Sequence, residues 1–145
     1  MENSTVTSKS SKLKLNFKES KYATGRRKTS IAKVWLKKGS GKIYVNGKIY
    51  SDYFANDNHK MQITRPFEII NQPTEYDVRC SVKGGGPTGQ AGAMVHGISK
   101  ALVLFDDKFK STLKSEKLTT RDSRAVERKK PGRRKARRSF QFSKR

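Results

Sequence analysis

The chain has 145 residues, of which 32% are hydrophobic, and 34 lysine and arginine residues against 12 acidic ones give it a formal net charge of +22. This composition indicates that part of the chain folds and part does not, and that its partner is a polyanion. The single cysteine, Cys80, excludes an internal disulfide, and no apolar run approaches the roughly 20 residues that a membrane span needs.

Most of the positive charge lies in the two ends of the chain. Residues 1–48 carry a net charge of +11 and residues 128–145 carry +10, whereas residues 49–127 carry +1. A near-neutral body between basic ends predicts a core that packs and extensions that bind. The predicted parts are a flexible N-terminal extension over 1–21, a globular body over 22–118 and a basic tail over 119–145.

The N-terminal extension begins MENSTVTSKSSKLKLNFKES, which is rich in serine and lysine and lacks the apolar core of a secretory signal. Organelle transit peptides are also poor in acidic residues, but here the first arginine comes only at Arg26. Two interpretations therefore stay open: a flexible basic extension and a targeting segment.

Alternating apolar residues predict two short strands between Thr29 and Tyr50. The residues expected to face the core are Ala32, Val34 and Leu36 in the first strand and Ile43 and Val45 in the second. A glycine-containing turn joins the strands, and Asn46–Gly47 is a second turn signal. Trp35 lies opposite Val34 and is expected to be partly exposed or to cover a sheet edge.

Residues 51–75 are less periodic. A short helix is predicted after Ser51, and Pro66 suits the first turn of another helix. The segment YDVRCSV, residues 76–82, then alternates between apolar and polar side chains, which indicates a half-buried strand.

Apolar residues at spacings of three and four predict an amphipathic helix of about four turns from Ala91 to Phe105. A shorter helix is expected around residues 107–113. Beyond Leu118 the chain has no apolar face to bury, and Pro131–Gly132 favours an extended path for the tail. This order of elements predicts an α+β fold in which helices cover one face of a mixed sheet.

The stretch VKGGGPTGQAGAMVHG, residues 82–97, spells G-x-G-x-x-G before the predicted helix. A dinucleotide site also needs a strand after the helix that ends in an acidic residue, and a P-loop needs Lys-Ser or Lys-Thr; neither is present. No cofactor is therefore expected. The glycines can instead let backbone N–H groups bind a phosphate at the helix N-terminus, or they can allow close strand–helix packing. Both interpretations stay open.

Catalytic and metal-binding patterns are equally weak. One cysteine and two histidines cannot form the usual four-ligand zinc site without carboxylates. The neighbouring Asp106 and Asp107 point in different directions at a helix end. His96, near the apolar stripe of the helix, is expected to be a hydrogen-bonded structural residue. No metal site and no enzymatic activity are expected.

Three motifs in order carry a family resemblance: YATGRRKTSIAKVWLKKGSGKIYVNG, VKGGGPTGQAGAMVHGISKAL and the terminal PGRRKARRSFQFSKR. Together they closely resemble small-subunit ribosomal protein S9 of the bacterial or organellar type, from about Tyr22 to Arg145. The resemblance implies a mixed four-stranded sheet with two main helices, of the type found in the second domain of ribosomal protein S5.

The same resemblance implies a structural role in the head of the small ribosomal subunit. The expected partners are the 3′ major domain of the small-subunit ribosomal RNA and the seventh, tenth and fourteenth proteins. The tail is expected to thread through RNA so that its end lies near the anticodon stem-loop of the transfer RNA in the peptidyl site. The implied location is a ribosome of the bacterial cytoplasm or of an organelle, with the mitochondrial matrix favoured over the plastid.

Positions that match the family motifs are expected to contact RNA. Those assigned to ribosomal RNA are Arg26, Arg27, Lys28, Lys83, Gly84, Gly85, Gly86, Gln90, Arg121, Arg124, Arg128, Lys129, Lys130, Arg133, Arg134, Lys135, Arg137 and Arg138. Those expected to face transfer RNA are Ser143, Lys144 and Arg145.

The dimensions of the tail suit this task. If extended, residues 128–145 span at most roughly 60 Å, far beyond a body whose radius of gyration is about 13 Å. Phe140 and Phe142 can stack on bases or pack against a protein neighbour. The alternative classes are a free nucleic-acid-binding protein of chromatin or the nucleoid and a nucleotide-dependent enzyme.

Overall fold

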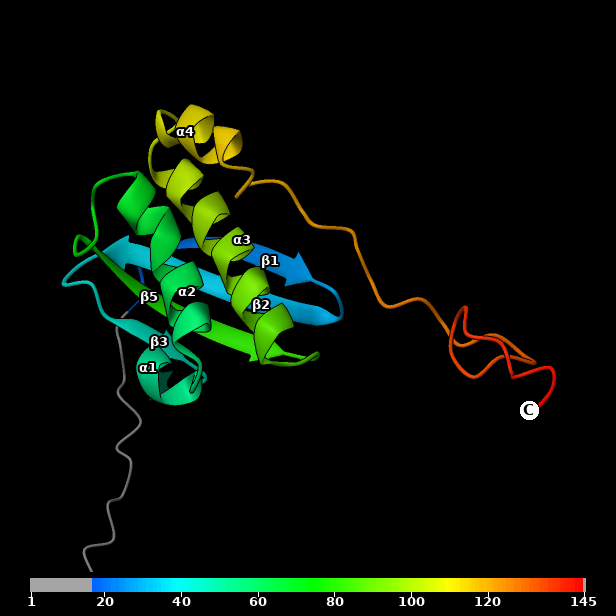
Figure 1. Cartoon of the computed structure of the whole chain (residues 1–145). Helices are drawn as coiled ribbons and strands as arrows, with labels where there is room; N and C mark the ends of the chain where they lie inside the picture. The colour runs from blue at the N-terminus through cyan, green and yellow to red at the C-terminus, as the bar shows by residue number, and fades with distance from the viewer. Residues whose placement is uncertain (1–16, 145) are drawn as a thin grey trace, which may run out of the picture.

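In the computed structural model, which describes residues 17–144, a β-sheet carries helices on one of its faces (Figure 1). The strands are β1 (Lys21–Arg27), β2 (Ser30–Lys38), β3 (Ile43–Val45), β4 (Lys48–Ile49) and β5 (Tyr76–Lys83). The helices are α1 (Tyr50–Tyr53), α2 (Asp57–Ile69), α3 (Pro87–Phe105) and α4 (Phe109–Ser115). The predicted α+β class is confirmed.

The sheet is mixed, as expected, but it has five strands rather than four. Their order is β1-β2-β5-β3-β4, and neighbouring strands are antiparallel except for β3 and β5, which are parallel. The additional edge strand, β4, follows a turn at Asn46 and Gly47, whose φ angles are 49° and 86°. Positive φ at both positions suits a two-residue hairpin turn, so the turn predicted here is confirmed.

The two predicted strands β2 and β3 are both present, but β5 lies between them in the sheet. The chain that connects them crosses the end of β5 and is held there by Asp77. The carboxylate of Asp77 accepts hydrogen bonds from the backbone N–H groups of Ser40 and Lys42, at 2.8 and 3.0 Å. Partial burial raises the pKa of Asp77, but the hydrogen bonds from Lys42 and Ser40 outweigh it and leave the pKa below its usual value.

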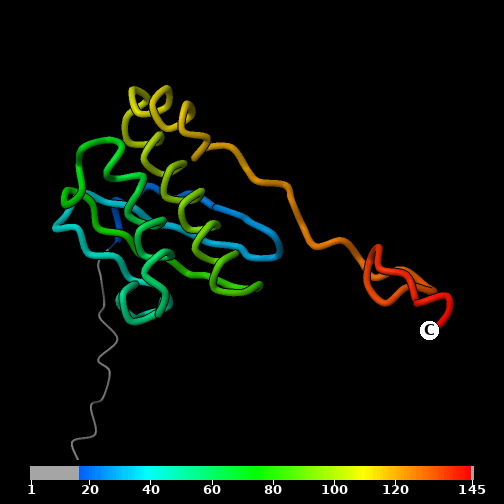
Figure 2. Tube along the Cα trace, in the orientation of Figure 1, coloured from blue at the N-terminus to red at the C-terminus, as the bar shows by residue number. Residues whose placement is uncertain are grey.

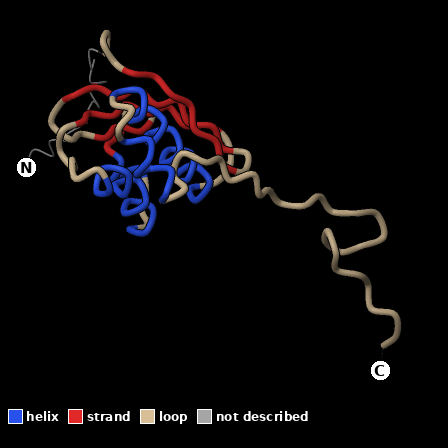
Figure 3. The backbone as a smooth tube through the Cα atoms, turned by 90° about the horizontal axis from the view of Figure 1, so that it is seen from above, coloured by secondary structure: helices blue, strands red, loops and turns tan. Residues whose placement is uncertain are grey.

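The hydrophobic core lies between one face of the sheet and the helices α2 and α3, a two-layer arrangement that Figure 3 shows edge-on. The buried side chains that form most of it are Ala32, Val34 and Leu36 of β2, Val78, Cys80 and Val82 of β5, and Met94, Ile98 and Leu102 of α3. These are the faces predicted from alternation and from helical spacing. Burial raises the pKa of the Cys80 thiol to about 12.

The helix boundaries differ from those predicted. The helix α2 begins at Asp57, because the side chain of Asn56 caps it by accepting a hydrogen bond from the N–H of Asn58 at 3.0 Å. Pro66 therefore lies inside this helix rather than in its first turn, and it is buried. The helix α3 begins at Pro87 and spans 19 residues, more than the four turns predicted. The short helices predicted on either side of these two are present as α1 and α4.

The tail leaves the body after α4 and folds back on itself near its end (Figures 1 and 2). Gly132, with a φ of 71°, turns the chain, and Arg133 and Ser139 form an isolated β-bridge. The N–H of Arg134 donates to the carbonyl of Arg138 at 2.8 Å. The expectation of an extended path is therefore wrong for this stretch, because Gly132 takes up a left-handed conformation that reverses the chain.

No helix in the described part of the chain has the length and hydropathy of a membrane span. The N-terminal extension lies outside the described residues as far as residue 16, and so does Arg145. The division of the chain at residues 21 and 118 stays a prediction.

Candidate nucleic-acid interface

The tail begins beside the turn from β1 to β2, where basic residues from distant parts of the chain meet. Arg26 and Arg27 end β1, and Lys28 follows in the turn. These three residues, which the family resemblance assigns to ribosomal RNA, therefore lie at the end of a strand that begins at Lys21. Asp122 and Arg124 of the tail line a shallow pocket with Arg27 and Lys28. We call Arg26, Arg27, Lys28, Asp122 and Arg124 the tail-root cluster.

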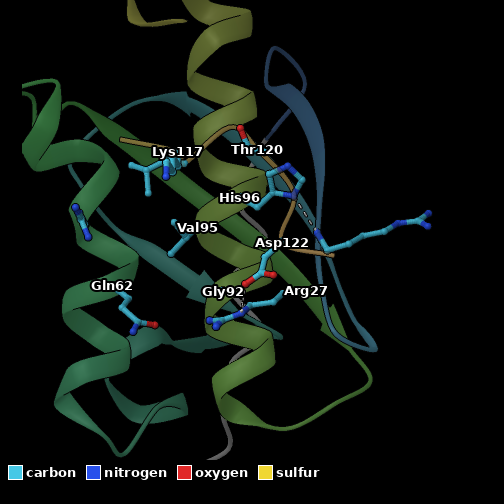
Figure 4. Close-up of a pocket in the computed structure, with 11 residues that line it drawn as sticks. Arg27, Gln62, Gly92, Val95, His96, Lys117, Thr120 and Asp122 are labelled. Carbon is cyan, nitrogen blue, oxygen red and sulfur yellow. Dashed lines mark hydrogen bonds and ion pairs between the residues drawn. The ribbon is translucent and has the colours of Figure 1, made fainter. Parts of the chain in front are cut away.

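The side chain of Arg27 reaches the tail by crossing α3 at Gly92, as Figure 4 shows. A Cβ atom at Gly92 would come within 2.8 Å of a guanidinium nitrogen of Arg27. Beyond this crossing, the Nε of Arg27 lies 3.9 Å from a carboxylate oxygen of Asp122. The missing side chain at Gly92 therefore provides the space in which Arg27 connects the sheet to the tail.

Asp122 holds the tail root through a second arginine as well. The guanidinium of Arg124 donates to both carboxylate oxygens, from Nε at 3.1 Å and from Nη2 at 2.8 Å, and its backbone N–H donates at 3.1 Å. These hydrogen bonds from Arg124, together with the charges of Arg124 and Arg27, hold the pKa of Asp122 well below its usual range. The carboxylate is therefore ionised throughout the physiological range of pH.

His96 joins α3 to the last residues of β1. Its Nδ1 accepts a hydrogen bond from the backbone N–H of Arg26 at 3.2 Å. Burial and the charge of Lys100 lower the pKa of His96, and a hydrogen bond with the backbone of Thr119 only partly offsets them. The neutral ring therefore fixes the strand, the helix and the start of the tail together. His96 is the hydrogen-bonded structural residue that was expected.

The glycine run packs against the β1–β2 turn. Gly84 and Gly85 have φ angles of 75° and 61°, and a Cβ at Gly84 would lie 2.7 Å from the carbonyl oxygen of Thr29. A Cβ at Gly89 would lie 2.7 Å from the hydroxyl of Ser30, which donates to the carbonyl of Gly84 at 3.0 Å. These contacts favour the packing interpretation of the glycines, whereas a phosphate site there stays a prediction.

Gln90, expected to contact RNA, uses its side chain within the protein. Its Nε2 donates to the carbonyl of Gly84 at 3.2 Å, and its Oε1 accepts from the hydroxyl of Tyr53 at 2.9 Å. Gln90 thus holds the glycine run onto α3 and α1. Gly86 of this run borders open space, because a Cβ atom added there would meet no neighbouring atom within 4 Å.

Three residues that the sequence did not single out line a pocket beside the tail-root cluster: Gln62 and Arg65 of α2 and Lys117 after α4 (Figure 4). Arg65 also forms an ion pair with Glu116 at 2.8 Å, which joins α2 to the end of α4. The only sequence feature that could have identified two of these pocket residues is the spacing of three between Gln62 and Arg65, which places both on one face of a helix. This feature could be recognised only if the helix was known to begin at Asp57 rather than near Pro66.

The basic side chains of the tail are exposed, but several have partners within it. Glu127 pairs with Lys130 at 2.9 Å and with Arg137 at 3.0 Å, and these two cations lower the pKa of Glu127. The guanidinium of Arg134 lies 5.4 Å from the ring centroid of Phe140. Two of the residues expected near transfer RNA, Ser143 and Lys144, are exposed at the end of the tail.

The remaining basic candidates are spread over both sides of the body. Arg121 is exposed beside His96, close to the tail-root cluster. Lys83 ends β5 and pairs with Ile31, so it lies on the face of the sheet that is turned away from the helices. Lys83 therefore lies near Arg26 of the tail-root cluster, with Ile31 between them, but apart from the contacts of Arg27 and Arg124 with Asp122. Within residues 17–144, histidine, cysteine and acidic side chains form no group of three that could hold a metal ion.

The model of a family described as Ribosomal protein S9/S16 matches residues 25–145. The match begins inside β1 and includes the tail-root cluster, the glycine run and the whole tail.

Proposed function

The chain belongs to the Ribosomal protein S9/S16 family, and we propose that it binds small-subunit ribosomal RNA through the tail-root cluster and the tail, while the end of the tail contacts transfer RNA in the peptidyl site. Membership makes it a structural protein of the small ribosomal subunit. Ribosomal RNA and other ribosomal proteins are the partners that membership implies.

The single observation that carries the proposal is the exposure of the basic tail. Residues 128–145 contain ten basic and no acidic side chains, and every basic side chain from Arg128 to Lys144 is exposed. In isolation these charges repel one another, whereas along an RNA backbone each one displaces a counterion. The tail therefore gains stability by binding RNA.

The tail-root cluster supports a phosphate contact close to the body. Two guanidinium groups, those of Arg27 and Arg124, converge on the single carboxylate of Asp122. A phosphate group accepts the same bidentate hydrogen bonds as a carboxylate. The side chain of Arg124 is 84% exposed, so a phosphate can approach it without a change in the fold.

The finer placement follows from the family resemblance. The proposed RNA partner is the 3′ major domain of the small-subunit ribosomal RNA, and the proposed neighbours are the seventh, tenth and fourteenth proteins of the subunit head. The proposed compartment is the bacterial cytoplasm or an organelle, with the mitochondrial matrix favoured over the plastid. At the tail end, Ser143, Lys144 and Arg145 are proposed to face the anticodon stem-loop, beside the fully exposed ring of Phe142.

The test is reconstitution of small subunits with the full chain or with a variant that ends at Phe142. Co-sedimentation measures assembly, and filter binding measures the affinity for transfer RNA in the peptidyl site. We expect equal assembly and weaker transfer RNA binding for the truncated chain, because it lacks two positive charges at the contact. Unchanged affinity for transfer RNA would overturn the proposed role of the tail end.

The matched control is the double variant Lys110→Ala, Lys114→Ala. It also removes two exposed positive charges, but from α4 rather than from the tail. If this control weakens transfer RNA binding as much as the truncation does, the effect is one of overall charge and the positional role of the tail end is refuted.

A further inference from the structure

The face of the sheet that is turned away from the helices carries a row of aromatic and basic side chains. The registers of the strands place Tyr22 of β1 beside Trp35 of β2, Trp35 beside Arg79 of β5, and Arg79 beside Tyr44 of β3. The rings of Tyr22 and Trp35 are 5.3 Å apart, and the guanidinium of Arg79 lies 5.7 Å from the Trp35 ring centroid. We call these four residues the aromatic row.

The side chains around the aromatic row are basic. On the same face, Ile31 of β2 lies between Arg26 of β1 and Lys83 of β5. Lys33 lies between Ile31 and Trp35 along β2. All three of these basic side chains are exposed, and Ile31 is 40% exposed. Apart from Asp77, the strands turn no acidic residue to this face, and the carboxylate of Asp77 is bound by the Ser40–Lys42 loop.

The aromatic row is accessible. No helix or strand within residues 17–144 packs on this face, and Figure 3 shows all the helices on the opposite side of the sheet. Tyr22 is 45% exposed, and Trp35 and Tyr44 are half-buried. A contiguous group of accessible aromatic side chains on an open sheet is typical of a surface at which a partner binds.

We propose that this open face binds unpaired nucleotides of RNA, with bases stacked on Tyr22 and Trp35 and phosphates held by Lys33, Arg79 and Lys83. The surrounding positive charges favour the binding of a polyanion over the binding of a typical protein surface. The aromatic rings select bases over phosphate alone, and the bases of an A-form duplex are not accessible for stacking. Unpaired RNA is therefore the partner that provides both phosphates for the basic side chains and free bases for the aromatic rings.

This inference rests on the RNA binding proposed above, but it concerns the aromatic row, a surface that meets the tail-root cluster only at Arg26. The tail-root cluster and the tail offer mainly charge, whereas the aromatic row offers stacking platforms. The two surfaces therefore differ in their ligand requirements. A polyanion without bases can still bind the positive charges of the tail, but only a nucleic acid with free bases can stack on the aromatic row.

Trp35 provides the test, because it is the single tryptophan in the chain. Two titrations of the full chain are made: the anisotropy of fluorescein-labelled dodecauridylate measures total binding, and Trp35 fluorescence with unlabelled dodecauridylate measures contact at the aromatic row. Inorganic polyphosphate of similar length serves as the polyanion without bases. We expect dodecauridylate to quench Trp35 and polyphosphate to bind without quenching it.

Two variants locate the effect. Tyr22→Ala should weaken the binding reported by Trp35 by about five-fold or more, which corresponds to the loss of one stacking platform. Lys110→Ala on α4 is the control and should leave the quenching curve unchanged. Circular dichroism of both variants confirms that they fold, as expected for substitutions at exposed positions.

The outcomes separate this inference from the proposed function. If anisotropy reports binding but Trp35 is not quenched, the open face does not bind unpaired RNA and the tail remains the RNA-binding element. If dodecauridylate shows no binding at all, this inference is overturned, whereas the proposed function is judged separately by reconstitution and by binding to ribosomal RNA.

Discussion

Gly25 of β1 and Ala93 of α3 are in such close contact that no side chain fits between them. A Cβ atom at Gly25 would collide with the carbonyl oxygen of Ala93 and lie 2.9 Å from the α-carbon of Gly97. Both obstacles belong to the backbone of one helix, so neither can rotate away. The edge strand β1, which ends in Arg26 and Arg27, is therefore positioned by direct backbone packing on α3.

The first prediction is that Gly25→Ala strongly destabilises the fold. The added methyl group must push β1 away from α3, and overpacking of this kind costs about 1–3 kcal/mol or more. Urea unfolding followed by circular dichroism measures the change. Gly86→Ala is the control, because Gly86 has free space and a φ of −105°, and it should change the free energy of unfolding by less than about 1 kcal/mol. Equal losses for both variants would contradict the packing argument.

The second prediction concerns His96 and pH. Its pKa is lowered in the folded protein, so the unfolded chain binds more protons in the range just below the ordinary value of 6.5. The free energy of unfolding should therefore fall as the pH decreases through 6.5, and the contribution of His96 should be fully present above that value. Urea unfolding at several pH values measures the slope.

The matched variant for this prediction is His96→Gln, whose amide can accept a hydrogen bond but does not titrate. The slope of stability against pH between about 5 and 7 should become flatter in this variant, since the proton linkage of His96 is lost. A slope identical to that of the parent chain would show that His96 does not couple protonation to folding.

The sequence predicted those elements whose faces are marked by large apolar residues. The alternation of Val78, Cys80 and Val82 in β5 and the helical spacing around Met94 and Ile98 in α3 identified the core. These patterns are local, so that they can be recognised without knowledge of the partner element.

The elements that the sequence left out lack such markers. The buried residues of β1 are Ala23 and Gly25, and small side chains give no hydrophobic alternation. The strand becomes visible only when α3 is placed on it. Similarly, Asn56 lies in a segment without hydrophobic periodicity, so the sequence did not identify it as a helix cap. Pro66 instead suggested a helix that begins close to it, whereas α2 begins at Asp57.

The candidate site divides in the same way. Charge composition identified the basic tail, whereas Arg26, Arg27 and Lys28 were assigned to RNA from the family resemblance. The contact between Arg27 and Asp122 could not be predicted, because it depends on how closely the tail passes α3 at Gly92. The tail turn at Gly132 was missed because Pro131–Gly132 suits both an extended chain and a reversal, and only the contacts after it distinguish them.

The third prediction is that Asp122→Asn releases the tail root. The neutral amide cannot accept the paired hydrogen bonds of Arg124 and loses its attraction for Arg27, so amide hydrogen exchange should accelerate over residues 120–127. Exchange in β2 and β5 should not change. Because the pKa of Asp122 is lowered in the folded state, the parent chain should keep these contacts at neutral and mildly acidic pH and lose them only as the pH falls through that lowered pKa. Faster exchange spread over the whole sheet would instead indicate a role in global stability.

The fourth prediction concerns the salt dependence of RNA binding. If the tail neutralises about ten phosphates, the logarithm of affinity for ribosomal RNA should fall with the logarithm of salt concentration with a slope of about −7 to −9. Replacing Arg133, Arg134, Arg137 and Arg138 with Gln removes four of these contacts and should make the slope shallower by about 3.

Filter binding of the full chain and its variants to small-subunit ribosomal RNA at several salt concentrations measures this slope. The control replaces Lys38, Lys48, Lys110 and Lys114, four exposed lysines of the body, with Gln. This variant has the same net charge as the tail variant, but its losses lie outside the tail, so its slope should stay close to that of the parent chain. A parent slope shallower than about −3 would contradict a tail that tracks the RNA backbone, because such a value corresponds to only about three or four neutralised phosphates.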